Sequence, residues 1–116
     1  LDLDVGSPWP LDHADAVICI NMVHIAPWSA TEGLFAGASR VLATGLPLVL
    51  YGPFRRDGLP LEPSNAAFDR SLRERDPRWG LRDLGDVAAC AGESGFKLEQ
   101  IIEMPANNLS VVFRRA

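Results

Sequence analysis

The stretch AVICINMVHIAPWSATE, residues 16–32, decides the fold class. Its first residues are continuously apolar up to Asn21, as in a strand that is buried on both faces of a sheet. Ser29 and Glu32 have the spacing of a capping box, which predicts that a helix begins at Ser29. Ligands of open α/β sheets bind where such strands end. We therefore expect Asn21 and His24 to lie at a ligand-binding edge.

Three helices are predicted in the rest of the chain. The helix that starts at Ser29 is expected to end at Gly45, because glycine accepts left-handed backbone at low cost. Ser64 and Asp83 are the predicted caps of the second and third helices. Gly95 is predicted to terminate the third helix.

Three further strands are predicted, and their spacing sets their directions. The buried strand Pro47–Tyr51 follows a helix and is expected to run parallel to the strand before that helix. Only four residues separate the strand-like segments Lys97–Met104 and Leu109–Arg114. A parallel crossover needs a dozen residues or more, so these two segments should form an antiparallel hairpin. The sequence thus predicts an α/β fold with two parallel strands, a terminal hairpin and helices on the faces.

Composition restricts the class of protein and its partners. The chain has 116 residues, 47% of them hydrophobic and 22% charged, which suits a single globular domain. Its net charge of -4 gives no basic surface for nucleic acid or an anionic membrane. Cys19 and Cys90 are predicted to be reduced core thiols of a cytoplasmic protein, and no cysteine or histidine pattern suggests a metal site.

Four segments resemble one known family. They are INMVHIAPWSATEGLFAGASRVL, LVLYGPF, SNAAFDRSLRERDPRWGLRDL and MPANNLSVVFRR. They are similar to the methyltransferase-like family called domain of unknown function 938. The resemblance implies the Rossmann-like fold of class I S-adenosylmethionine-dependent methyltransferases, with residues 1–116 as a partial domain from its carboxyl-terminal half. The glycine-rich loop of such enzymes is absent from this sequence.

The resemblance also implies a cofactor and a reaction. S-adenosylmethionine would be the methyl donor, and a small molecule would be the acceptor in the full-length protein. This chain alone is expected to be inactive and to bind the cofactor weakly or not at all. Asp4 and Val5 match the segment that faces the cofactor in such folds. The amide of Asn21 could hold the methionine end of the cofactor or the substrate, or it could only satisfy backbone groups at the end of the strand.

The candidate catalytic residues are His24 and Tyr51. His24 would accept a proton from the methyl acceptor, since a neutral imidazole suits a general base. Its alternative role is structural, bonding a backbone carbonyl. Tyr51 ends a buried strand and is expected to face the same cleft, unless it is only a core residue. Trp28 and Phe54 could form walls of the acceptor pocket or simply pack in the core.

Polar residues downstream are candidates for acceptor binding. Asn65, Arg75 and Arg78 belong to a segment that could close as a lid and bind an anionic group. The alternative is a salt-bridged helix, because Asp69 and Arg73 have i,i+4 spacing. Asn107 and Asn108 could contact the acceptor or only form the hairpin turn; these two substrate candidates lie between the last two strands.

Two further expectations concern function and assembly. The competing hypothesis to an enzyme is a non-catalytic, methyltransferase-like binding or interaction module. If the neighbouring part of the sheet is absent, the strand at residues 16–21 would expose an apolar edge. We therefore expect this chain to associate, either with a second copy or with its own missing half.

Overall fold

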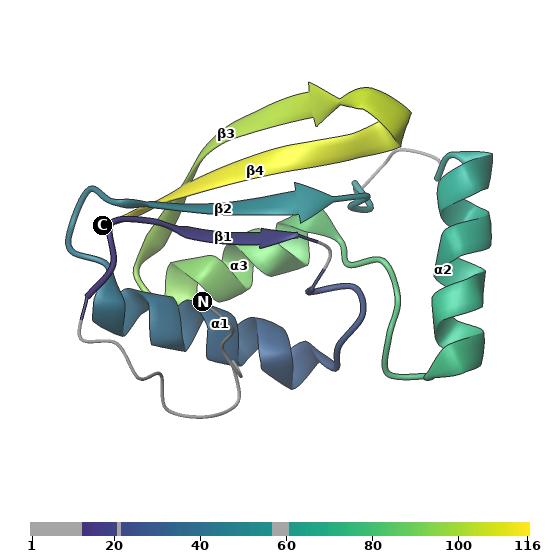
Figure 1. Ribbon diagram of the computed structural model, residues 1–116, viewed down its shortest axis with the longest axis horizontal. Helices are drawn as coiled ribbons and strands as arrows, with labels where there is room; N and C mark the ends of the chain where they lie inside the picture. The colour runs from purple at the N-terminus through teal and green to yellow at the C-terminus, as the bar shows by residue number, and fades with distance from the viewer. Residues whose placement is uncertain (1–12, 21, 57–60) are drawn as a thin grey trace.

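Four strands form a mixed sheet in the order β1-β2-β4-β3 (Figure 1). The computed structural model describes residues 13–20, 22–56 and 61–116. The strands are β1 (Val17–Ile20), β2 (Pro47–Gly52), β3 (Phe96–Met104) and β4 (Asn108–Arg115). Strand β1 is parallel to β2, whereas β4 is antiparallel to both β2 and β3. The predicted pair of parallel strands and the terminal hairpin are both confirmed.

Three helices accompany the sheet: α1 (Trp28–Val41), α2 (Pro63–Arg75) and α3 (Leu84–Glu93). Helices α1 and α3 contact each other, and α3 also packs against β3. Figure 1 shows α2 standing apart, beyond the carboxyl ends of β1 and β2. Among the described residues, none of the helices has the length and apolar character needed to cross a membrane.

Two of the three predicted helix caps are wrong. Helix α1 begins at Trp28, with Pro27 at the cap position, and no side chain caps it. Helix α2 begins at Pro63 instead of after Ser64, because proline fits the first helical turn, where its missing N–H is not needed. The prediction for Asp83 is confirmed, since its carboxylate accepts a hydrogen bond from the N–H of Asp86.

One face of the sheet is covered by α1 and α3 and forms the core. Leu48 and Leu50 of β2 are buried there with Phe113 of β4. Phe35 of α1 lies edge-on to Phe113, with ring centroids 5.4 Å apart. Each such side chain contributes about 1.5–3 kcal/mol by leaving water. The core therefore couples the parallel strands, the hairpin and α1.

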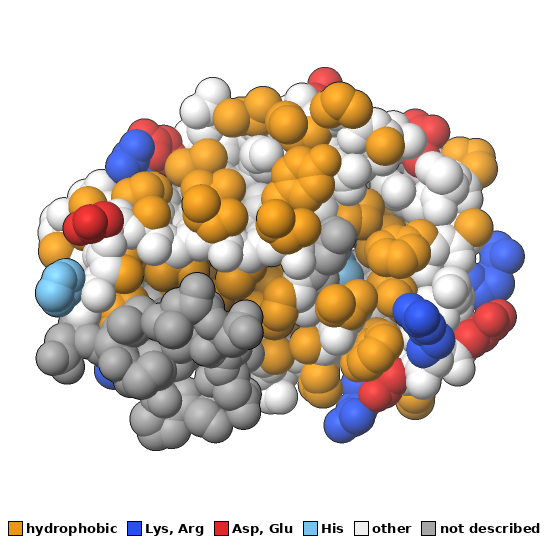
Figure 2. Space-filling model, viewed as in Figure 1, with side chains coloured by type: hydrophobic (Ala, Val, Ile, Leu, Met, Phe, Trp, Pro, Cys, Tyr) orange, Lys and Arg blue, Asp and Glu red, His pale blue; other side chains and the backbone are white. Residues whose placement is uncertain are grey.

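The other face of the sheet carries exposed apolar side chains, so the prediction that β1 is buried on both faces is wrong for the described residues. Ile18 and Ile20 of β1 are 68% and 65% exposed, because their neighbours Val17 and Cys19 are the ones that face the core. Ile102 of β3 is also exposed. Figure 2 shows hydrophobic side chains gathered over the part of the molecule where the strands lie. Within the described residues, β1 forms one edge of the sheet, as expected.

The turns explain where glycine and asparagine are needed. Gly45 and Gly95 have φ angles of 89° and 84°, the left-handed backbone predicted for them. However, α1 already ends at Val41, so Gly45 belongs to the turn before β2. In the hairpin turn Ala106 and Asn107 are left-handed, whereas Asn108 is extended and starts β4. Asn108 is thus not a left-handed turn residue.

Candidate functional site

His24 and Phe54 meet at the carboxyl ends of β1 and β2. His24 lies in the turn after β1, and Phe54 follows β2 by two residues. Their rings are 4.7 Å apart and inclined by 72°, in an edge-to-face arrangement. His24 is fully buried and Phe54 is 5% exposed. The structure therefore brings these two predicted residues together, with Phe54 packed into the core.

A loop before α3 holds His24 from a second side. The backbone N–H of Arg82 donates a hydrogen bond to Nδ1 of His24, at 3.0 Å. The N–H of Gly80 donates to the carbonyl of His24, at 2.9 Å. The other ring nitrogen, Nε2, is buried and has no hydrogen-bond partner among the described residues. A buried polar atom without a partner costs about 1–3 kcal/mol, so it is a position that a ligand could satisfy.

These contacts determine the protonation state of His24. A backbone N–H can only donate, so Nδ1 must present a lone pair to Arg82. The neutral ring then carries its proton on Nε2. Burial, followed by the positive charge of Arg82, lowers the pKa of His24 from 6.5 to about 4, although Asp69 opposes the shift. At pH 7 His24 is therefore neutral, with an N–H donor at Nε2 that has no partner among the described residues.

Arg82 ties the loop after β1 to the segment before α3. Its Nε donates to the carbonyl of Val23 at 3.0 Å, and its Nη2 donates to the carbonyl of Ala26 at 2.7 Å. A further bond joins Nη2 to the carbonyl of Arg78. The guanidinium carbon also lies 5.7 Å from the centroid of the Trp28 ring, within range of a cation–π contact. Arg82 therefore positions both His24 and Trp28.

Asp69 of α2 is a second centre of polar contacts. Its carboxylate accepts hydrogen bonds from Nη2 of Arg55 at 3.1 Å and from the N–H of Leu81 at 2.8 Å. Nε of Arg73 completes the group. Burial alone would raise the pKa of Asp69, but the Leu81 N–H and the two guanidinium groups outweigh it and hold the pKa below its usual value. The i,i+4 ion pair with Arg73 is the one expected from the sequence.

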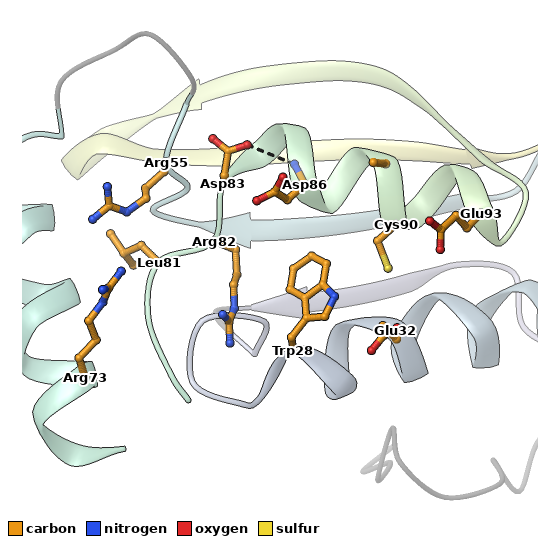
Figure 3. A pocket seen from close by; sticks show the side chains of 11 residues that line it. Trp28, Glu32, Arg55, Arg73, Leu81, Arg82, Asp83, Asp86, Cys90 and Glu93 are labelled. Atoms are coloured by element: carbon orange, nitrogen blue, oxygen red, sulfur yellow. Dashed lines mark hydrogen bonds between the residues drawn. The ribbon is translucent and has the colours of Figure 1, made fainter. Parts of the chain in front are cut away.

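A groove of about 930 Å³ lies next to the arginines that make these contacts, Arg55, Arg73 and Arg82 (Figure 3). Helices α1 and α3 supply much of its wall, and the loop before α3 adds Leu81, Arg82 and Asp83. Arg55 comes from the segment after β2 and Arg73 from α2. Figure 3 shows Arg55 and Arg73 at one end, near Leu81, and Arg82 beside Trp28. The groove is lined by Trp28, Glu32, Arg55, Arg73, Leu81, Arg82, Asp83, Asp86, Ala89, Cys90 and Glu93. Of the predicted pocket walls, Trp28 lines this groove.

The family match follows from the whole sequence. Residues 1–115 match the family described as "Protein of unknown function (DUF938)". The chain belongs to the DUF938 family. The resemblance expected from the four sequence segments is therefore confirmed.

This DUF938 chain is similar in fold to parts of several solved structures. It is similar to CalO1, a methyltransferase in calicheamicin biosynthesis in its SAH-bound form, with a TM-score of 0.81 at 13% identity; the match covers 100% of this chain and 34% of that chain. It is similar to the pyocyanin biosynthetic protein PhzM, with a TM-score of 0.74 at 18% identity, over 91% of this chain and 32% of that chain. It is also similar to "a pericyclic reaction enzyme", with a TM-score of 0.82 at 12% identity, over 98% and 29%.

These comparisons confirm the fold class. The four-stranded mixed sheet and its three helices correspond to part of a methyltransferase fold. The DUF938 chain spans about a third of the length of the solved chains that it matches.

The other predicted site residues of this DUF938 chain lie in several separate parts of the structure. Tyr51 lies half-buried on β2, next to the core residue Leu50 but on the opposite face of the sheet. Arg75 is exposed at the end of α2, and Arg78 is an exposed partner of Asp76. No hydrogen bond joins any of these residues to His24 in the described part of the chain.

Asn65 and the hairpin asparagines lie together, away from His24. Nδ2 of Asn65 donates to the carbonyl of Asn107, at 3.3 Å, and so links α2 to the hairpin turn. Nδ2 of Asn108 donates to the carbonyl of Pro105 within the same turn. These observed bonds are structural, and contact with an acceptor stays a prediction for the three asparagines.

The three candidate cofactor residues lie outside the described residues. They are Asp4, Val5 and Asn21. Their role in binding S-adenosylmethionine stays a prediction.

Sequence reasoning missed the two residues that organise the site. Arg82 was not a candidate, although it fixes the loop that carries His24. Arg55 was not a candidate either, yet it shares Asp69 with Arg73. The segments after β2 and before α3 are rich in arginine, and this was the available signal for the site. Arginine content alone does not show which guanidinium groups lie close together in the folded chain.

Proposed function

We propose that the full-length protein transfers a methyl group from S-adenosylmethionine to a small-molecule acceptor. The observation that carries this proposal is the likeness of the whole chain to part of the CalO1 methyltransferase. The unpartnered Nε2 of His24, at the carboxyl end of the parallel strands, supports it further. That is the edge at which open α/β sheets bind their ligands.

The chemistry needs an electrophilic methyl group, which S-adenosylmethionine supplies from its sulfonium. A lone pair of the acceptor forms the new bond to carbon while the electrons of the carbon–sulfur bond stay with sulfur. In this proposal Asp4, Val5 and Asn21 bind the cofactor. The two free cysteines, Cys19 and Cys90, support a reducing, cytoplasmic environment.

We further propose that His24 acts on the acceptor through Nε2. Because Nδ1 accepts a hydrogen bond from the N–H of Arg82, the neutral ring carries its proton on Nε2, and in this proposal Nε2 donates a hydrogen bond to an acceptor that is already ionised. Acting as a general base would require the other tautomer, which would set two donors, Nδ1–H and the N–H of Arg82, against each other. The donor role is therefore favoured, and the base role is the alternative.

A matched pair of variants distinguishes the two roles. His24→Gln can place an N–H near the position of Nε2, whereas His24→Asn can accept from Arg82 but has no group at that position. Under the donor role, His24→Gln keeps much of the turnover and His24→Asn loses it. Under the base role, both variants lose about 10²–10⁴-fold in turnover. Release of S-adenosylhomocysteine by the full-length protein with its acceptor measures this directly, and full turnover in both variants would return His24 to a structural role.

A function without methyl transfer is the second candidate. The observation that favours it is the equally high similarity to a protein described as a pericyclic reaction enzyme. This fold is therefore compatible with a different reaction or with binding alone. Binding of S-adenosylmethionine without formation of S-adenosylhomocysteine, across a broad set of acceptors, would favour this candidate.

A further inference from the structure

Three arginines line one end of the groove, and two of them share a single ion-pair partner. Arg55, Arg73 and Arg82 line this arginine end, and Asp69 is the carboxylate that pairs with the first two. The guanidinium of Arg82 donates only to backbone carbonyls in the described structure. Two guanidinium groups thus share the carboxylate of Asp69, and the guanidinium of Arg82 has no ion-pair partner among the described residues. Burial, followed by the like charge of Arg73, lowers the pKa of Arg82, although Asp69 opposes the shift.

Several guanidinium donors at this end are unused among the described residues. Arg73 bonds only through Nε, which leaves both of its terminal nitrogens. Arg55 bonds only through Nη2, and its Nε is buried without a partner. Nη1 of Arg82 is also without a partner. Such forked donors match the two oxygens of a carboxylate or a phosphate.

The backbone fixes two of these arginines side by side. The N–H of Arg55 donates to the carbonyl of Arg82 at 2.9 Å, and the N–H of Leu84 donates to the carbonyl of Arg55 at 2.7 Å. This short parallel bridge joins the segment after β2 to the segment before α3. The arginine end is therefore built on paired backbone and is not a chance meeting of long side chains.

The carboxylates that line the rest of the groove indicate which charge a ligand can carry at its other end. The carboxylate of Asp83 already caps α3, and Asp86 in the first turn of the same helix also lines the groove. After burial, the charges of Glu32 and Glu93 raise the pKa of the Cys90 thiol, which places both carboxylates near Cys90. Figure 3 shows Glu32, Cys90 and Glu93 away from Arg55 and Arg73, with Trp28 between the two groups. A second negative charge on the ligand would be repelled there.

We infer that this groove binds a small acid, with its carboxylate or phosphate at Arg55, Arg73 and Arg82 and an apolar or aromatic body alongside Trp28. The inference deepens the proposed function, on which its link to catalysis rests, by assigning the methyl acceptor to the class of small monoacids. The groove adjoins the candidate site, because Arg82 also donates its N–H to His24.

The test titrates the full-length protein, without S-adenosylmethionine, with benzoate, phenyl phosphate and the neutral analogue benzamide. The indole N–H signal of Trp28 in NMR spectra reports on the groove. We expect the carboxylate probe, the phosphate probe or both to bind and shift this signal, and benzamide to bind much more weakly. Comparing the two acids shows which anion the site prefers.

Arg73→Gln is the decisive variant, because its side chain is 57% exposed and its loss leaves Asp69 paired with Arg55. We expect acid binding to weaken about ten- to a hundredfold, the loss typical of a hydrogen bond to a charged group. Arg70→Gln, an exposed position on the same helix, should leave binding unchanged. Absence of acid binding, or equal affinity in wild type and Arg73→Gln, would overturn the inference. This titration contains no cofactor, so its outcome does not depend on the methyltransferase proposal. If that proposal fails but the present inference holds, the protein binds the acid probes, and a separate titration detects no binding of S-adenosylmethionine.

Discussion

Burial of His24 makes the stability of the protein depend on pH. In the unfolded chain a histidine takes up its proton near its ordinary pKa of 6.5, whereas folding lowers the pKa of His24 to about 4. Between these two values the unfolded state binds more protons than the folded state. Lowering the pH through this window therefore favours unfolding.

The size of the effect follows from the two pKa values. Their difference corresponds to a loss of about 3 kcal/mol when the pH falls from 7 to below 4. Most of this loss, about 2.5 kcal/mol, should be present at pH 4.5. Domains of this kind are stable by only about 5–15 kcal/mol, so the loss is large. The lowered pKa of Asp69 contributes in the same direction, but only below its usual value of 3.8.

Urea denaturation, followed by tryptophan fluorescence at several pH values between 7.5 and 4.5, measures this loss. His24→Asn keeps an acceptor for the N–H of Arg82 but has no titrating group, so its free energy of unfolding should fall less by about 2.5 kcal/mol over the same range. His13→Gln removes an exposed histidine and should behave like wild type. An equal fall in wild type and His24→Asn would refute the argument from burial.

Two more predictions concern backbone strain and assembly. An added Cβ at Gly80 would lie 3.0 Å from Oδ1 of Asp69, at a φ of 153°, so Gly80→Ala should cost about 1–3 kcal/mol of unfolding free energy in urea. Gly92→Ala, in a helix with open space around it, should instead stabilise by about 0.5–1 kcal/mol, and the opposite order would contradict this account. Light scattering should show that the chain of 116 residues self-associates, and replacing the exposed Ile18 and Ile20 by lysine should reduce this association. A monomeric wild-type chain at high micromolar concentration would contradict the prediction of self-association.

The sheet was predictable because its signals are local. The continuous apolar character of Val17–Ile20 and Pro47–Gly52 predicted two parallel strands, although β1 is covered on one face only among the described residues, because Ile18 and Ile20 are exposed. The short connection between β3 and β4 permits only an antiparallel pair. Helix starts were less predictable, because Pro27 and Pro63 favour a start that competes with the nearby serines.

The candidate site was predictable only in part, because its contacts are distant in sequence. His24 could be placed at a strand end from the chain order alone. Its partner, the N–H of Arg82, is 58 residues away, and neither residue type nor spacing indicates that a backbone group occupies Nδ1. The groups around Asp69 also come from three separate segments. Only the packed structure shows that Nε2 of His24 is buried without a hydrogen-bond partner among the described residues.

Titration of the full-length protein with S-adenosylmethionine in a calorimeter tests the central claim most directly. The account predicts saturable binding to one site, with S-adenosylhomocysteine competing for it. Binding of neither molecule up to millimolar concentration would contradict the claim that the protein is a methyltransferase.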